Sequence, residues 1–124
     1  MANFRDMLTA RAATVFPGRD YNAFREKHDV DPEARQAPLH FEDVVVEASP
    51  ETSLAQKILP SFARFLSRKK VAFENPSNIL VALFLGETCY VLAGEALLDL
   101  FCEVEGISRA ALHGRMSRWI TGSS

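Results

Sequence analysis

Residues that could perform catalysis or bind a metal are few in this sequence, and they are scattered. The three histidines, His28, His40 and His113, have no partner at the spacing of metal ligands. The chain contains no G-x-S-x-G nucleophile motif, no glycine-rich phosphate loop and no H-E-x-x-H zinc motif. Because no nucleophile stands beside a recognisable base, the sequence predicts a protein that is not an enzyme, with no catalytic residues. It also predicts no metal site and no cofactor.

The two cysteines and three regularly spaced acids have structural explanations. Cys89 and Cys102 lie in apolar segments, where a free cysteine usually acts as a small hydrophobic residue, and two cysteines build no disulfide framework. Glu95, Asp99 and Glu103 recur every four residues, so on a helix they share one face. Without a histidine or a second helix to complete a metal site, we expect that face to be solvated.

The charge of the chain is close to neutral overall but unevenly distributed. There are 14 Lys and Arg and 16 Asp and Glu, a formal net charge of −2, which excludes a chain that binds polyanions by bulk charge. Residues 76–105 contain five acids and no Lys or Arg, whereas residues 106–124 contain three arginines and no acid. This asymmetry indicates either a partner for the basic C-terminus or a solvated helix end, where cations are favoured.

The C-terminal segment carries one local pattern that indicates a function. From Gly106 onward it reads GISRAALHGRMSRW. Ser108 is a favoured helix N-cap residue, and Leu112, Met116 and Trp119 fall on about one side of the helix that would follow it. Gly106 ends the preceding helical pattern as a C-cap residue does. The segment therefore predicts two helices joined by a tight turn.

Residues 98–119 resemble the helix-turn-helix of Fis-type bacterial DNA-binding regulators. In that family a glycine makes the turn, an aliphatic residue follows it, and a small polar residue with arginine opens the recognition helix. The matching residues here are Gly106, Ile107, Ser108 and Arg109. The resemblance implies a regulator of transcription whose recognition helix reads DNA. The DNA-contacting residues that it implies are Ser108, Arg109, His113, Arg115 and Arg118.

A second basic patch would add contacts to the phosphate backbone of DNA. It consists of Arg64, Arg68, Lys69 and Lys70. The most apolar stretch, residues 78–92, is apolar nearly all round and must be buried. Residues 78–104 are therefore expected to form the interface of a homodimer or the contact with a protein partner.

A second hypothesis stays open, that of a protein–protein interaction module without nucleic-acid contact. Such a module would be an adaptor, an antagonist or an assembly subunit. In it the C-terminal arginines would only solvate the end of a helix. The near-neutral net charge of −2 favours this class, whereas the pattern that begins at Gly106 favours DNA binding.

The length and composition predict a single globular domain in the cytoplasm. The chain has 124 residues, of which 48% are hydrophobic and 24% charged, values that exclude a fully disordered protein. The apolar stretch is too short and too interrupted to span a membrane, and nothing at the start resembles a signal peptide. Within the domain we expect an N-terminal helical arm over residues 1–24, a polar loop over residues 25–38 and the main body over residues 39–124.

The elements that must position these residues are predicted to be mostly helical. Apolar spacing from Phe4 to Val15 predicts an N-terminal helix, and Ser49 is a good start for another, with a break at Pro60. Residues 78–92 are expected to form a buried helix. Residues 94–105 are expected to form a further helix that buries Leu97, Leu98, Phe101 and Val104.

Two short segments favour strands over helices. Residues 39–48 read LHFEDVVVEA, and the three consecutive valines favour a strand. Residues 71–73 read VAF and could pair with it. The predicted fold class is therefore mostly α, or α+β with a small sheet of strands near residues 40–47 and 71–73. In either case the C-terminal half is expected to be compact and helical.

Overall fold

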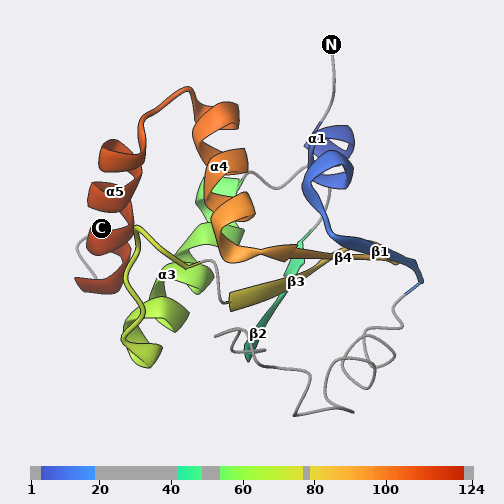
Figure 1. Cartoon of the computed structure of the whole chain (residues 1–124), viewed down its shortest axis with the longest axis horizontal. Coiled ribbons are helices and arrows are strands. Elements are labelled where there is room, and N and C mark those ends of the chain that lie inside the picture. The colour runs from blue at the N-terminus through green and yellow to red at the C-terminus, as the bar shows by residue number, and fades with distance from the viewer. Residues whose placement is uncertain (1–3, 19–41, 49–53, 77–78, 122–124) are drawn as a thin grey trace.

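The computed structural model describes residues 4–18, 42–48, 54–76 and 79–121, and it shows an α+β fold built on a four-stranded sheet (Figure 1). β3 pairs antiparallel with β4, β4 pairs antiparallel with β1, and β2 lies parallel to β3. The strand order is therefore β1-β4-β3-β2. The strands are β1 (Thr14–Pro17), β2 (Glu42–Ala48), β3 (Ile79–Leu85) and β4 (Thr88–Ala93).

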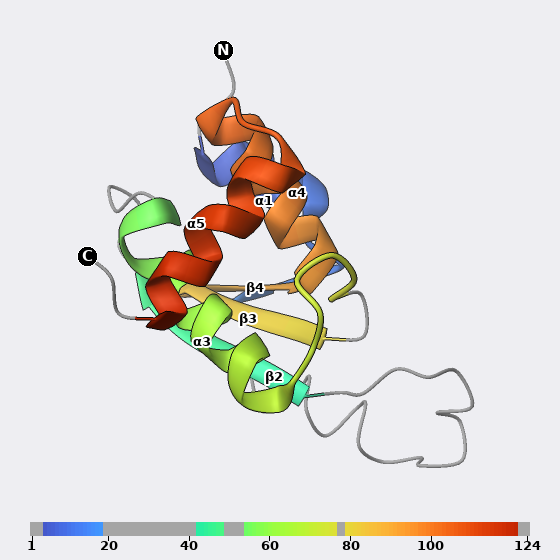
Figure 2. The ribbon, with the colours of Figure 1, turned by 90° about the vertical axis from the view of Figure 1, so that its left-hand side faces the viewer.

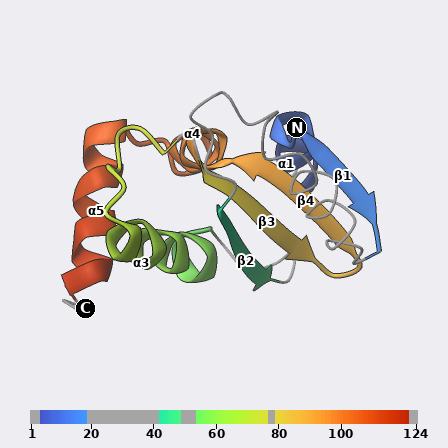
Figure 3. The ribbon, with the colours of Figure 1, turned by 60° about the horizontal axis from the view of Figure 1, so that its bottom comes forward.

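The helical segments share one apolar core with the sheet. They are α1 (Phe4–Arg11), the π-helical turn η2 (Leu54–Ile58), α3 (Leu59–Lys69), α4 (Gly94–Glu105) and α5 (Arg109–Thr121). Their buried side chains meet alternate residues of β3 and β4, such as Val81, Leu83 and Leu92. α5 packs against both α3 and α4, and Figures 2 and 3 show α3 and α5 together at the side of the molecule that lies away from β1.

The prediction of a buried helix over residues 78–92 is wrong, because the described residues 79–93 form the β3–β4 hairpin. One face of these strands joins the main core, and the other carries a second apolar cluster that includes Ala82 and Val91. A strand buried on both faces is apolar at every position, as a fully buried helix is. Gly86, with φ +63°, begins the two-residue turn. Most residues of this hairpin are buried.

One of the two predicted strands is confirmed. β2 occupies residues 42–48, inside the valine-rich segment, and pairs with β3. The strand predicted over residues 71–73 is wrong, because these residues belong to an irregular connection between α3 and β3. Val71 and Phe73 pack against the main apolar core instead of pairing with another strand.

The N-terminal helix is shorter than predicted. α1 ends at Arg11, and residues 14–17 form β1 instead of a last helical turn. β-Branched Thr14 and Val15 favour a strand, and β4 supplies its hydrogen-bonding partner. Leu8 is fully buried in the main core. The polar loop predicted over residues 25–38 and the helix start at Ser49 lie outside the described residues.

The other helix predictions are confirmed with one exception. A fresh helix starts beside Pro60, where η2 gives way to α3 with the proline in its first turn. α4 covers residues 94–105 and ends at Gly106, as the sequence indicated. Val104 was expected on the buried face of α4, but it is 41% exposed, because the helix ends one residue later and this last turn extends past the core.

Candidate functional site

The sequence pattern from Gly106 forms two helices joined by a tight connection. Gly106 has φ +67° and ψ +36°, a left-handed conformation that stops α4, and the backbone N–H of Ile107 donates to the Cys102 carbonyl at 3.1 Å. The hydroxyl of Ser108 accepts a hydrogen bond from the backbone N–H of Ala111 at 3.1 Å. Ser108 thus caps α5, as its residue type predicted.

The apolar side of α5 faces the core. Leu112 and Met116 are 1% and 0% exposed. Trp119 is half-buried, and its ring lies edge-on to that of Phe101, with 6.4 Å between the ring centroids. The helical spacing of these residues therefore predicted the orientation of α5.

Each of the three basic residues on the sides of α5 faces a carboxylate. The guanidinium of Arg109 donates to Asp99 Oδ1 through Nη2 at 2.8 Å and through Nε at 3.2 Å. Two further pairs join α5 to its neighbours, Arg115 with Glu105 at 3.3 Å and His113 with Glu74 at 3.2 Å. Because these carboxylates lie on α4, at its end and in the connection after α3, α5 is bound to the elements around it and its positive charge is balanced locally.

The outward face of α5 is made of small residues. Ala110, Ala111 and Gly114 are exposed, and an alanine Cβ built at Gly114 meets nothing within 4 Å. Arg118 is the exposed cation of this face and forms no ion pair with any described residue. We call Ala110, Ala111, Gly114 and Arg118 the outward face of α5 below.

The second predicted basic patch lies on α3 and at Lys70, the residue that caps its C-terminus. Arg64, Arg68, Lys69 and Lys70 are all exposed. Arg68 and Lys69 lie over the ring of Phe65, at 5.6 Å and 6.0 Å from its centroid. Within the described ranges, Arg64, Arg68 and Lys70 have no carboxylate partner. The structure thus places the two predicted sets of basic residues on neighbouring helices.

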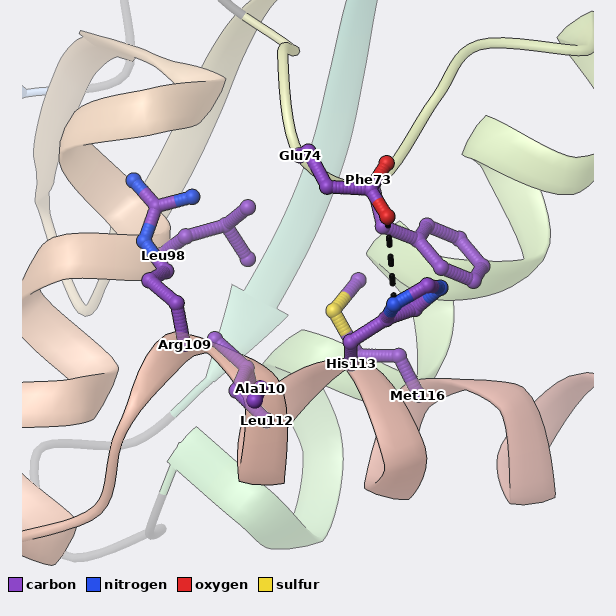
Figure 4. Close-up of a pocket in the computed structure, with 8 residues that line it drawn as sticks. All are labelled: Phe73, Glu74, Leu98, Arg109, Ala110, Leu112, His113 and Met116. Carbon is purple, nitrogen blue, oxygen red and sulfur yellow. Dashed lines mark ion pairs between the residues drawn. The ribbon is translucent and has the colours of Figure 1, made fainter.

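A pocket of about 320 Å³ opens between α4, α5 and the connection that follows α3 (Figure 4). Arg109 and His113 were predicted as site residues, whereas Leu98, Leu112 and Met116 were predicted only as buried residues. No local signal could have placed Phe73 and Glu74 here, because the connection after α3 is remote in sequence from α4 and α5. The lining residues are Phe73, Glu74, Leu98, Arg109, Ala110, Leu112, His113 and Met116.

Both cysteines are free thiols, as expected. Cys89 is buried in β4, and Cys102 is half-buried on α4. Burial raises the pKa of the Cys102 thiol, the guanidinium of Arg109 lowers it in part, and the carboxylate of Asp99 raises it further. The thiolate is therefore a minor species at neutral pH, which limits its reactivity.

The described part of the chain holds no group of three or more His, Cys, Asp or Glu side chains that could bind a metal ion. His28 and His40 lie outside it. None of the described helices is long and apolar enough to cross a membrane. In comparisons with known proteins, no protein-family model, no curated protein and no solved structure matches the chain.

Proposed function

We propose that this chain is a non-enzymatic protein–protein interaction module that receives its partner on the outward face of α5. The observation that carries the proposal is that Arg109, His113 and Arg115 each face a carboxylate. Because these carboxylates balance the positive charges, α5 offers little net attraction to a polyanion such as DNA. What α5 presents to the solvent is a small, nearly neutral surface with one arginine.

The charge around this surface supports a protein partner. Residues 94–121 carry four acids (Glu95, Asp99, Glu103 and Glu105) against three arginines, so the α4–α5 pair has a slight negative excess. Such a surface does not attract a polyanion. Alanine and glycine also allow the close approach of a partner helix, because the distance between packed helices depends on the side chains at their contact. The free thiols fit a reducing compartment, and we place the protein in the cytoplasm.

Site-specific photocrosslinking tests this proposal. A benzophenone amino acid replaces Ala111 in one variant and Glu87, exposed at the β3–β4 turn, in a control variant. After irradiation of living cells, we expect a discrete protein adduct at residue 111 and none at residue 87. A further substitution, Gly114→Arg, should remove the adduct. A second copy of this chain as the captured protein would identify a homodimer. The absence of any protein adduct at residue 111 would contradict the proposal.

A DNA-binding regulator is the second candidate function, and two observations favour it. Arg64, Arg68 and Lys70 on α3 and Arg118 on α5 are exposed without a carboxylate partner among the described residues. Gly106 also ends α4 in a left-handed conformation just before α5, at the position where the predicted resemblance places its turn. In this candidate function α3 contacts the phosphate backbone, and Ser108, Arg109, His113, Arg115 and Arg118 face the groove.

A salt titration with a fluorescent DNA duplex distinguishes the two functions. DNA binding predicts that log K falls linearly with log salt, and that Arg64→Gln, Arg68→Gln and Lys70→Gln together flatten the slope by up to about three units, at about 0.9 unit per phosphate contact. Arg5→Gln, an exposed arginine on α1, is the control and should leave the slope unchanged. No measurable affinity at low salt would remove the DNA candidate and leave the protein-interaction proposal standing.

A further inference from the structure

The pocket beside α5 has the size and lining of a small-molecule site. Its volume of about 320 Å³ falls within the range of about 300–1,000 Å³ that is typical of small-molecule pockets. Leu98, Leu112 and Met116 lie beneath it and are 0–1% exposed, so its accessible apolar surface comes from half-buried Phe73 and exposed Ala110. Small-molecule sites combine such an apolar lining with a few polar groups that fix orientation.

The polar groups of the pocket lie at two opposite sides. Figure 4 shows Arg109 at one side and the His113–Glu74 ion pair at the other. The Arg109 guanidinium is held by Asp99 and by the Glu95 carbonyl, which accepts from Nη2 at 3.3 Å. Its Nη1 makes no hydrogen bond with the described residues. The arginine is therefore fixed in orientation with one pair of N–H donors unused.

The burial of these charges indicates which one a ligand would use. Both charges already have a partner, Asp99 for Arg109 and His113 for Glu74, but the side chain of Arg109 is 36% exposed and that of Glu74 is 66% exposed. A charge that is less hydrated interacts more strongly with a ligand charge. Arg109 also offers planar N–H donors that match the geometry of a carboxylate. The pocket is therefore better suited to an anion than to an amine.

We propose that this pocket binds a small carboxylic acid with an apolar body. The carboxylate accepts hydrogen bonds from Nη1 of Arg109, and the apolar body covers the ring of Phe73 and the methyl group of Ala110. The ligand stays within the volume of about 320 Å³. This proposal goes beyond the protein-interaction function and does not depend on the identity of the partner that α5 contacts.

Three matched probes test the proposal on the full chain. They are 3-phenylpropanoate, its neutral amide 3-phenylpropanamide and the cation 3-phenylpropan-1-amine, which share one apolar body. We measure binding by isothermal titration calorimetry and by saturation-transfer NMR. The carboxylate is expected to bind at least about tenfold more tightly than the amide, because a hydrogen bond to a charged group contributes more than a neutral one. The amine should bind no better than the amide.

Two variants with matched controls locate the binding site. Arg109→Gln should remove the preference for the carboxylate and leave amide binding within about twofold. Arg118→Gln, with the same change of charge on the same helix, should change neither. Ala110→Trp places an indole at the pocket and should abolish binding of all three probes. Ala111→Trp, the neighbouring exposed position outside the lining, should not. Circular dichroism confirms that each variant is folded.

The outcomes are decisive in both directions. Loss of the carboxylate preference in Arg109→Gln but not in Arg118→Gln, together with loss of binding in Ala110→Trp but not in Ala111→Trp, supports the proposal. It is overturned if no probe binds the parent protein, if the carboxylate and the amide bind equally, or if the control variants lose binding as the test variants do. None of these outcomes decides whether α5 contacts a protein partner, which the photocrosslinking experiment tests separately.

Discussion

Arg109 connects three features of the C-terminal helix pair. It forms an ion pair with Asp99 on α4, lowers the pKa of the Cys102 thiol in part, and lines the pocket beside α5. One residue type serves all three roles because the guanidinium has several N–H donors and is charged at every physiological pH. The reactivity of the Cys102 thiol therefore reports on the charges of Arg109 and Asp99.

Substitutions on the two sides of this ion pair should change the reactivity of Cys102 in opposite directions. Arg109→Gln removes the charge that lowers the pKa of Cys102, so the thiolate fraction falls and alkylation by iodoacetamide at pH 8 slows. Asp99→Asn removes a charge that raises this pKa, so alkylation accelerates. Mass spectrometry of the labelled peptide gives the rate at Cys102, while buried Cys89 should stay unlabelled in the folded protein.

The pair of variants separates electrostatics from exposure of the thiol. Both variants break the same Arg109–Asp99 ion pair, so any opening of the surface should affect Cys102 similarly in the two. Rates that change in the same direction would show that access, not charge, controls the thiol. In the parent protein, the alkylation rate should continue to rise with pH beyond the usual range of a free thiol, because burial raises the pKa of Cys102.

At the scale of elements, two glycines near α5 have opposite conformational requirements. Gly106 has φ +67° at the end of α4, where a side chain strains the backbone. Gly114 lies within α5, has no positive φ, and faces open space. The same substitution to alanine should therefore destabilise the protein at the first position and stabilise it at the second.

The free energy of unfolding measures this difference. Gly106→Ala should lower it by about 1 kcal/mol, because a left-handed conformation costs about that much for a residue with a Cβ. Gly114→Ala should raise it by up to about 1 kcal/mol, the difference in helix propensity between the two residues. Urea denaturation followed by circular dichroism provides the values. Equal signs for the two changes would contradict the assigned conformations.

At the scale of the whole molecule, Gly94 marks the place where separate parts of the chain meet. It begins α4, and a Cβ built there lies 2.7 Å from Cζ of Phe62 on α3 and 2.9 Å from the carbonyl oxygen of Pro76. Real Cβ atoms do not approach other atoms so closely, so either α4 or its neighbours must shift. The close packing of α4 on α3 and on the connection before β3 thus depends on the absence of a side chain at this residue.

Gly94→Ala should destabilise the fold although alanine favours helices. Overpacking of a close contact costs about 1–3 kcal/mol, which exceeds the gain of about 1 kcal/mol in helix propensity. The free energy of unfolding should therefore fall, in contrast to its rise in Gly114→Ala. The same urea experiment compares the two variants. A second-site change, Phe62→Leu, should reduce the cost of Gly94→Ala in a double-mutant cycle, because it removes the clashing ring atom.

Features that depend on local chemistry could be predicted from the sequence. Ser108 as a cap, Gly106 as a helix end and Pro60 at a helix start follow from hydrogen bonding and backbone sterics within a few residues. The valine-rich strand and the inward side of α5, with Leu112 and Met116, follow from side-chain shape and periodicity. In these places the physical cause acts over about one turn of helix or one strand.

Only the tertiary structure decided whether the central apolar segment forms a helix or strands, and which carboxylates face the basic residues of α5. Residues 79–85 and 89–93 are continuous apolar runs, which periodicity alone does not assign to helix or strand, and pairing with β1 and β2 decides for strands. Glu74 comes to His113 through the path of the chain after α3, and the fold closes the pocket there. Arg109 and Arg115 pair with acids ten residues before them, on α4 and at its end, because α5 folds back onto α4. Contacts between segments set these features, and no local pattern encodes them.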